Sequence, residues 1–186
     1  MAKVAFIMDE MFEDSEFRVP YDRVREAGHE AIIVGLEKGK KLTGKKEDET
    51  VTTDAAIGDV SANRFDALVI PGGYSPDKIR GNHDMVSLTR TMVERDKPVA
   101  AVCHAGWMLA EAGVLKGKTV TSWPSIKTDL KNAGANWVDR DVVVDGKLIT
   151  SRKPDDLAAF SEAIKNNLGS AGTKQRARPS EPDRRV

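Results

Sequence analysis

The only cysteine of the chain, Cys103, stands where a short apolar run gives way to a helical segment. Residues 99–102 are all apolar, as in a strand that is covered on both faces. Residues 107–112, followed by Gly113, predict a helix and its end. A thiol at this corner lies beside free backbone N–H groups and the positive end of the helix dipole, and both favour the thiolate. Because the thiolate is the nucleophilic form, the position favours covalent chemistry at Cys103.

The alternative is that Cys103 only packs, because a lone cysteine is more often a buried small hydrophobic residue than a nucleophile. Three features favour the reactive interpretation. The cysteine ends the apolar run instead of lying inside it, and the ionisable His104 follows it directly. A glycine-rich turn, residues 71–73, follows a second apolar run in the same way.

The elements that must position these residues alternate between strand and helix patterns. This alternation predicts an α/β fold with parallel strands, right-handed crossovers and helices in layers. An Asp-Gly turn at 145–146 predicts a hairpin near the end of the chain. The polar segment 37–53 predicts an exposed hairpin or loop that is solvated. The strands are expected at 4–8, 31–34, 65–70, 99–102, 119–122, 142–144 and 148–150, and the helices at 16–27, 85–93, 107–112 and 157–168.

Three loops leave the carboxyl ends of the predicted strands, where ligands bind in open α/β sheets. They cover residues 9–14, 71–77 and 103–104, and we expect them to converge. The first loop and the helix after it carry several acids, whose ordinary role is to complement the helix dipole. One of them, turned inward beside the thiol, could stay protonated and donate a hydrogen bond to sulfur, but spacing does not select which. The acids are Asp9, Glu10, Glu13, Asp14 and Glu16.

The turn at Gly72 and Gly73 has two interpretations. It is a turn that needs positive φ, or its bare backbone offers an N–H to a developing oxyanion together with the N–H of His104. The His104 side chain could act as an acid or base, for which it needs a carboxylate of its own. Asp77, near the start of a short helix, is equally suited to that role and to capping the helix.

Composition limits the remaining classes. The 186 residues include 29 acidic and 29 basic side chains, so no bulk field favours nucleic acid or a membrane surface. One cysteine excludes an internal disulfide and suits a reducing, cytoplasmic compartment, and three scattered histidines make a metal cluster improbable. The first apolar run is too short for a signal peptide or a membrane span. We expect one domain over 1–169, a basic, flexible tail over 170–186, and no cofactor.

Several motifs in order resemble the ThiJ/PfpI family, in the branch of PfpI-type intracellular proteases and bacterial general stress proteins. The resemblance runs from residue 3 to about residue 169. It is carried by FEDSE at 12–16, DALVIPGGYSPD at 66–77, KPVAAVCH at 97–104, AGVLKG at 112–117, NAGA at 132–135, and VVDG with TSR between 143 and 152.

This resemblance implies a flavodoxin-like three-layer sandwich with Cys103 as the nucleophile on a sharp elbow. It implies that Glu13 is the protonated acid touching the sulfur and that His104 is the neighbouring acid–base residue. The carboxylate for His104 then comes from Asp77 of an adjacent subunit in a homo-oligomer, a dimer that can build trimers or hexamers. Gly73 and His104 supply the oxyanion N–H groups, and the pocket is lined by Gly72, Tyr74 and Trp123.

Two positions depart from the family pattern. Ala105-Gly106 replaces the Gly-Pro found after Cys-His in many members, and Asp77 is one methylene shorter than the glutamate of many relatives. The related class I glutamine amidotransferases take a histidine from late in the chain, but none follows His104 here. That absence argues against amidotransferase activity.

The resemblance implies a stress-associated, cysteine-dependent hydrolase. Its substrates would be small 2-oxoaldehydes such as methylglyoxal, their early adducts on proteins (deglycase action), or peptides. A narrow pocket around one thiol favours the small aldehydes. The alternative is a protein without turnover, in which Cys103 senses peroxide by oxidation to a sulfinate or serves a redox chaperone.

Overall fold

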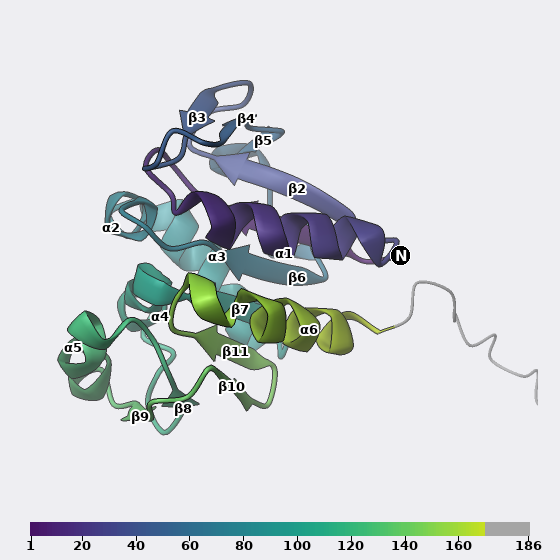
Figure 1. The fold of residues 1–186 in the computed structure, drawn as a ribbon. Coiled ribbons are helices and arrows are strands. Elements are labelled where there is room, and N and C mark those ends of the chain that lie inside the picture. Colours follow the sequence, from purple (N-terminus) through teal and green to yellow (C-terminus); the bar gives the residue numbers. More distant parts are fainter. Residues whose placement is uncertain (170–186) are drawn as a thin grey trace, which may run out of the picture.

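The computed structural model describes residues 1–169, and the basic tail expected over 170–186 lies outside the described residues. A seven-stranded sheet stands between two layers of helices (Figure 1). The strands are β1 Lys3–Ile7, β2 Glu30–Gly35, β3 Lys41–Thr43, β4 Thr50–Thr52, β5 Ala55–Ala56, β6 Ala67–Ile70, β7 Val99–Val102, β8 Thr119–Val120, β9 Asn136–Trp137, β10 Val142–Asp145 and β11 Leu148–Ser151. The helices are α1 Asp14–Glu26, α2 Ser75–Ile79, α3 His83–Glu94, α4 Gly106–Glu111, α5 Lys127–Asn132 and α6 Leu157–Leu168.

The sheet has the order β10-β11-β7-β6-β1-β2-β5. All neighbours pair in parallel except β10 and β11, which form the hairpin that the Asp-Gly turn predicts. The α/β class with a mostly parallel sheet and flanking helices is therefore confirmed. In this order β1, β6 and β7 are adjacent, so their carboxyl ends, and the loops that leave them, meet at one edge of the sheet.

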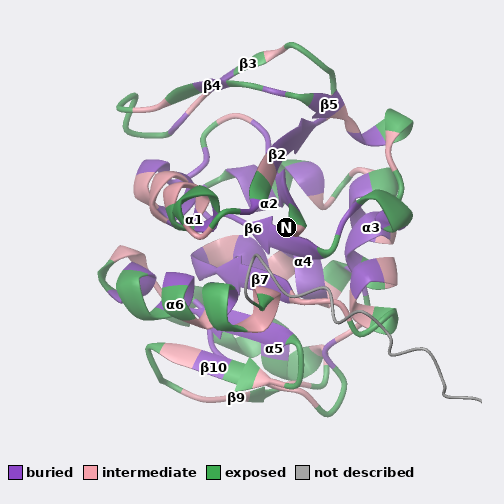
Figure 2. Ribbon diagram, turned by 90° about the vertical axis from the view of Figure 1, so that its right-hand side faces the viewer, coloured by how far each residue is buried: buried purple, intermediate pink, exposed green. Residues whose placement is uncertain are grey.

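Two apolar cores lie on the two faces of the sheet. Successive side chains of β1 alternate between them: Phe6 joins the core under α1 and α6, whereas Ala5 and Ile7 join the core under α3, α4 and α5. Figure 2 shows the buried central strands with α1 and α6 on one side and α3 on the other. Since both faces are covered, the central strands are apolar throughout, as the sequence predicts.

Two details of the sheet differ from expectation. The segment at 119–122 forms only the short strand β8, which pairs with β9 outside the main sheet. The edge strand β5 has two residues and was not predicted. A two-residue strand is too short to show a period in the sequence. Its place in the sheet comes from its pairing with Val34 and Gly35.

The segment between β2 and β5 forms a hairpin, β3–β4, which is docked on the start of α1 (Figure 1). The buried carboxylate of Asp14 accepts backbone N–H groups from Lys46, Asp48 and Glu49 at 2.9, 3.1 and 3.0 Å. A Cβ on Gly44 would overlap this carboxylate, so the turn requires glycine for its close approach. The hairpin β3–β4 with its turn, here called the β3–β4 arm, is therefore fixed against α1. The sequence predicted an exposed hairpin or loop but not this docking.

Replacing Asp14 with alanine is expected to lower the free energy of unfolding by about 2–4 kcal/mol. The change removes three charge-assisted hydrogen bonds and leaves their N–H donors without the acceptor that now holds the turn. Urea denaturation measures the loss. Asp48→Ala is the matched control, because its exposed side chain makes none of these bonds. Equal losses in the two variants would show that Asp14 does not anchor the arm.

Candidate active site

Cys103 occupies a strained turn at the end of β7. Its φ is +61°, in the left-handed region that a residue with a Cβ rarely adopts. A single 3₁₀ turn, Cys103–Ala105, leads from β7 into α4. This is the elbow expected from the sequence, and it leaves the cysteine 8% exposed.

The loops after β1 and β6 are joined to each other beside this elbow. Phe12 and Gly73 form an isolated antiparallel bridge, the N–H of Glu13 donates to the carbonyl of Gly72 at 3.1 Å, and the N–H of Tyr74 donates to the carbonyl of Met11 at 2.9 Å. Gly73 has φ +78°, and a Cβ there would overlap the backbone around Phe12. Backbone hydrogen bonds therefore hold the loops after β1 and β6 together, and Gly72 packs against Cys103, so the three loops converge as expected.

The acid that faces the sulfur is Glu16. Its side chain is 0% exposed and its Oε2 accepts the N–H of Gly72 at 2.9 Å, at the point where Gly72 packs against Cys103. The carboxyl and the thiol each influence the pKa of the other. Oε1 has no hydrogen-bond partner among the described residues. Burial, and then the charge of Glu13, raise the pKa of Glu16 to about 8, so the carboxyl is protonated at neutral pH. The expectation that Glu16 only complements the helix dipole is wrong.

Glu13 does not take the place at the sulfur that the family resemblance gave it. Its carboxylate is buried and forms ion pairs with two lysines of the β3–β4 arm, at 2.8 Å to Nζ of Lys45 and 2.9 Å to Nζ of Lys46. Glu13 is therefore the partner of the two lysines, and the protonated acid of the site is Glu16, three residues further along.

Opposing contributions act on the thiol of Cys103. Burial raises its pKa, and an ionised Glu16 raises it further, whereas the backbone N–H groups of His104 and Gly73 lower it. The elbow alone therefore does not make the thiolate, contrary to the simplest expectation from the sequence. With Glu16 protonated, its repulsion is absent, and the two groups behave as one coupled pair that shares protons.

His104 turns back toward the cysteine and is held between aromatic rings. Its Nδ1 lies 3.2 Å from the sulfur and its Nε2 lies 3.3 Å from Oγ of Ser125. The ring of Trp123 stacks on it at 6.3 Å, and Trp107 is tilted against it at 5.2 Å. Burial lowers the pKa of His104, and the charge of Lys45 lowers it further, so the imidazole is neutral at pH 7.

The other predicted site residues border this centre. Gly72 packs close against the site, since a Cβ there would overlap Glu16 and lie 2.7 Å from Cβ of Cys103. Tyr74 and Trp123 are exposed at its rim. Asp77 forms an ion pair with Arg80 at 2.9 Å and contacts no group of His104 within its own chain. The sequence interpretation did not single out Glu16 among the candidate acids, and it missed Lys45.

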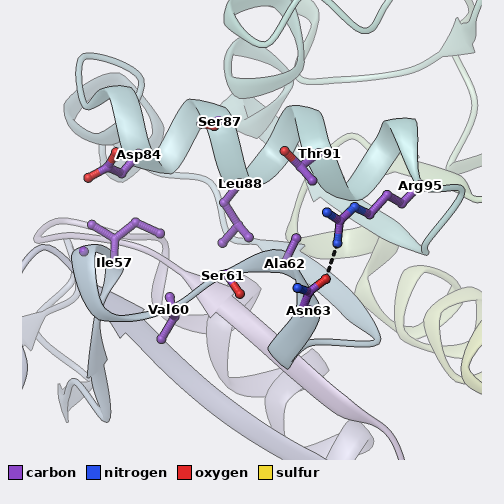
Figure 3. A pocket seen from close by; sticks show the side chains of 11 residues that line it. Ile57, Val60, Ser61, Ala62, Asn63, Asp84, Ser87, Leu88, Thr91 and Arg95 are labelled. Carbon is purple, nitrogen blue, oxygen red and sulfur yellow. Dashed lines mark hydrogen bonds between the residues drawn. The ribbon is translucent and has the colours of Figure 1, made fainter.

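A separate groove of about 330 Å³ lies between α3 and the segment 57–64 (Figure 3). Its walls carry hydroxyl groups, such as those of Ser61, Ser87 and Thr91, over an apolar floor, and Arg95 bonds Asn63 across one end. The groove contains no residue of the elbow and no thiol or imidazole, so it is separate from the site around Cys103.

The raised pKa of Glu16 predicts a pH-dependent stability. Between its ordinary value of 4.5 and about 8, the folded chain holds a proton that the unfolded chain has lost, so this group makes stability fall as pH rises through that window. Glu16→Gln removes the titration. We expect the free energy of unfolding of the native chain to fall relative to this variant, by a few kcal/mol, between pH 5 and pH 8. Urea denaturation at both pH values tests this, and identical pH dependence in the two proteins would contradict it.

The chain is similar in sequence and in fold to known proteins. The DJ-1/PfpI family model matches residues 2–167. Protein/nucleic acid deglycase 2 of Escherichia coli is 46% identical over 168 residues, which cover 90% of this chain and 98% of that protein. General stress protein 18 of Bacillus subtilis is 45% identical over 160 residues, covering 86% and 93%.

A solved two-domain protein of Anabaena variabilis, with DJ-1/ThiJ/PfpI-like and ferritin-like domains, matches with a TM-score of 0.90 and 40% identity. The match covers 95% of this chain and 52% of that protein, so the chain spans about half of its length. Across the described residues, no helix is both long and apolar enough to span a bilayer. The match of one family model over nearly all of the described residues, with relatives above 40% identity, shows that the chain belongs to the DJ-1/PfpI family.

Proposed function

We propose that this protein is a stress-associated, cysteine-dependent hydrolase that acts on small reactive carbonyls such as methylglyoxal and on their early adducts with proteins. One observation carries the proposal: a strained cysteine has a protonated carboxyl and two backbone N–H groups around its sulfur. Relatives named as a deglycase and a general stress protein support the same class. Cys103 is only 8% exposed, which favours a small aldehyde over an extended peptide.

The mechanism begins with the ionisation of the Cys103 thiol. Glu16 and Cys103 form a coupled pair, and a protonated Glu16 that donates to sulfur stabilises the thiolate, as the N–H groups of Gly73 and His104 do. We infer that the first proton leaves the pair from sulfur while Glu16 keeps its own. The thiolate is then available at neutral pH although burial opposes it.

The thiolate attacks the aldehyde carbon of methylglyoxal and forms a C–S bond, and the carbonyl oxygen becomes an alkoxide that the N–H groups of Gly73 and His104 can receive. A proton moves from the former aldehyde carbon to the neighbouring ketone carbon, which turns the hemithioacetal into a thioester. The neutral imidazole of His104, 3.2 Å from the sulfur, is suited to carry this proton. Water then cleaves the thioester, which releases lactate and returns the thiol.

His104 still needs a carboxylate partner, and within its chain it has none among the described residues. We propose that Asp77 of a second copy supplies it in a homo-oligomer. Asp77 is exposed and lies close to Arg80, which covers the ring of Trp107 at 4.4 Å beside His104. Asp77 is thus on the surface that borders the site. We further propose that residues 1–169 form the single catalytic domain and that the protein works in the cytoplasm, where thiols stay reduced.

Incubation of the protein with methylglyoxal, with lactate and remaining aldehyde measured over time, tests the function. We expect catalytic conversion to lactate and weak or absent hydrolysis of casein-type peptides. Treatment with mild peroxide followed by mass spectrometry separates the alternative. A stable sulfinate on Cys103 together with no turnover of methylglyoxal or of glycated peptides would favour a peroxide sensor and contradict the proposed hydrolase activity.

A further inference from the structure

Lys45 reaches the site from an element that the catalytic residues do not belong to. It lies in the turn of the β3–β4 arm, and its N–H donates to the carbonyl of Phe12 at 2.8 Å. Its side chain bonds Glu13 at 2.8 Å, on the loop that leads from β1 into α1. The hydrogen bond to Phe12 fixes the backbone of Lys45, and the ion pair with Glu13 fixes its Nζ. The ammonium group is therefore held in one place.

The anchoring of the whole arm supports this position. Besides the three N–H groups that Asp14 accepts, Arg18 bonds both carboxylate oxygens of Glu49 at 3.0 and 2.8 Å, and the N–H of Thr43 bonds Glu10 at 2.8 Å. These contacts tie β3 and the turn of the hairpin to the region that also carries Glu16. The turn that carries Lys45 is therefore fixed relative to α1.

The charge of Lys45 acts on the reacting groups themselves. Its hydrogen bond with Glu13 is the largest influence raising its pKa, and the charges of Glu13, Cys103 and Glu16 raise it further. The same ammonium lowers the pKa of His104. Since electrostatic coupling is reciprocal, a cation that is stabilised by a thiolate stabilises that thiolate in turn.

The neighbouring Lys46 differs, although it bonds the same carboxylate at 2.9 Å. Its side chain is 55% exposed, against 34% for Lys45. The largest influences on its pKa come from Glu13, Lys45 and Asp14, whereas those on Lys45 include Cys103 and Glu16. The two lysines therefore form a natural pair for comparison: they share a partner and a charge but differ in burial and in their coupling to the site.

We propose that Lys45 is a positioning residue that the β3–β4 arm delivers to the site, where its ammonium group supports negative charge on the sulfur of Cys103. His104 Nδ1 lies 3.2 Å from that sulfur, and Glu16 bonds Gly72, which packs against Cys103. Lys45 joins this cluster through Glu13, whose N–H bonds the carbonyl of Gly72. Lys45 is the one cation of this set. This inference deepens the proposed function, and it rests on the same thiolate.

The test is the rate at which iodoacetamide alkylates Cys103 at pH 7 in Lys45→Gln, Lys46→Gln and Lys45→Arg. We expect alkylation to slow about tenfold in Lys45→Gln, which corresponds to about one pKa unit. We expect less than about a twofold change in Lys46→Gln, whose exposed charge is screened. Lys45→Arg should keep most of the native rate because it keeps the charge.

Titration of the His104 ring by NMR gives a second readout: its pKa should rise in Lys45→Gln and not in Lys46→Gln. All variants keep the backbone bond to Phe12, and Lys45→Met against Lys46→Met repeats the comparison should a glutamine variant fold poorly. Equal slowing by the two lysine changes, an unchanged rate in Lys45→Gln, or a slow Lys45→Arg would overturn the proposal. Alkylation consumes no substrate, so these outcomes are independent of whether the protein turns over methylglyoxal.

Discussion

Cys103→Ser is expected to lower kcat/KM for methylglyoxal by about 10³-fold or more. The hydroxyl of serine is a far weaker acid than a thiol, so surroundings that can stabilise a thiolate leave the alcohol un-ionised at neutral pH and a much poorer nucleophile. The comparison uses the initial rate of aldehyde loss in both proteins.

The control for this prediction is the stability of the Cys103→Ser variant. The two side chains differ by one atom, and the polar neighbours of the sulfur can also bond a hydroxyl, so we expect the urea midpoint of Cys103→Ser to stay close to that of the native chain. A serine variant that removes methylglyoxal at the native rate would end the claim that this substrate is processed at Cys103.

Glu16→Gln is expected to lower kcat/KM by about 10²-fold, the range for loss of a general acid or base. The amide oxygen can still accept the N–H of Gly72, so the loop stays in place. The amide cannot lose or gain a proton at neutral pH, so the coupling with Cys103 is lost.

Glu13→Gln is the matched control, because the family resemblance gave the role of the protonated acid to Glu13. Its carboxylate bonds Lys45 and Lys46, so its loss should act only through Lys45 and cost no more than about tenfold. A larger loss in Glu13→Gln than in Glu16→Gln would reverse the assignment. The two variants thus decide which acid serves the sulfur.

The fold class was predictable because strand and helix patterns alternate along the sequence. Buried parallel strands are apolar on both faces, and the runs before Pro71 and Cys103 show this plainly. In open α/β sheets ligands bind beyond the carboxyl ends of the strands, so the loops that follow these two runs were expected to meet at one edge of the sheet. The position of the elbow could also be inferred, because Cys103 and the ionisable His104 follow directly on the apolar run 99–102.

The choice between Glu13 and Glu16 could not be made from spacing. Residues three apart lie on the same face of a helix, and a helix start is uncertain by one or two residues in a sequence. The structure begins α1 at Asp14, which leaves Glu13 before the helix, where Lys45 and Lys46 hold it. Glu16 then falls in the first turn of α1 and points at the elbow.

The role of the β3–β4 arm was beyond sequence reasoning for another reason. A short hairpin rich in lysine and acids has the composition of a solvated loop, and its docking depends on single contacts between residues about 30 positions apart. The carboxylate of Asp14 makes three of them. No period or motif in one sequence encodes such contacts, apart from the Gly44 turn that permits the close approach.

The rate of alkylation of Cys103 by iodoacetamide, measured from pH 5 to pH 10 against free cysteine, tests the reactive sulfur most directly. We predict that the protein reacts faster than free cysteine at pH 7 and that its profile has a midpoint no higher than about 8, where the pair with Glu16 first loses a proton. Reaction no faster than that of free cysteine at neutral pH, with a midpoint above about 9, would contradict a nucleophilic Cys103.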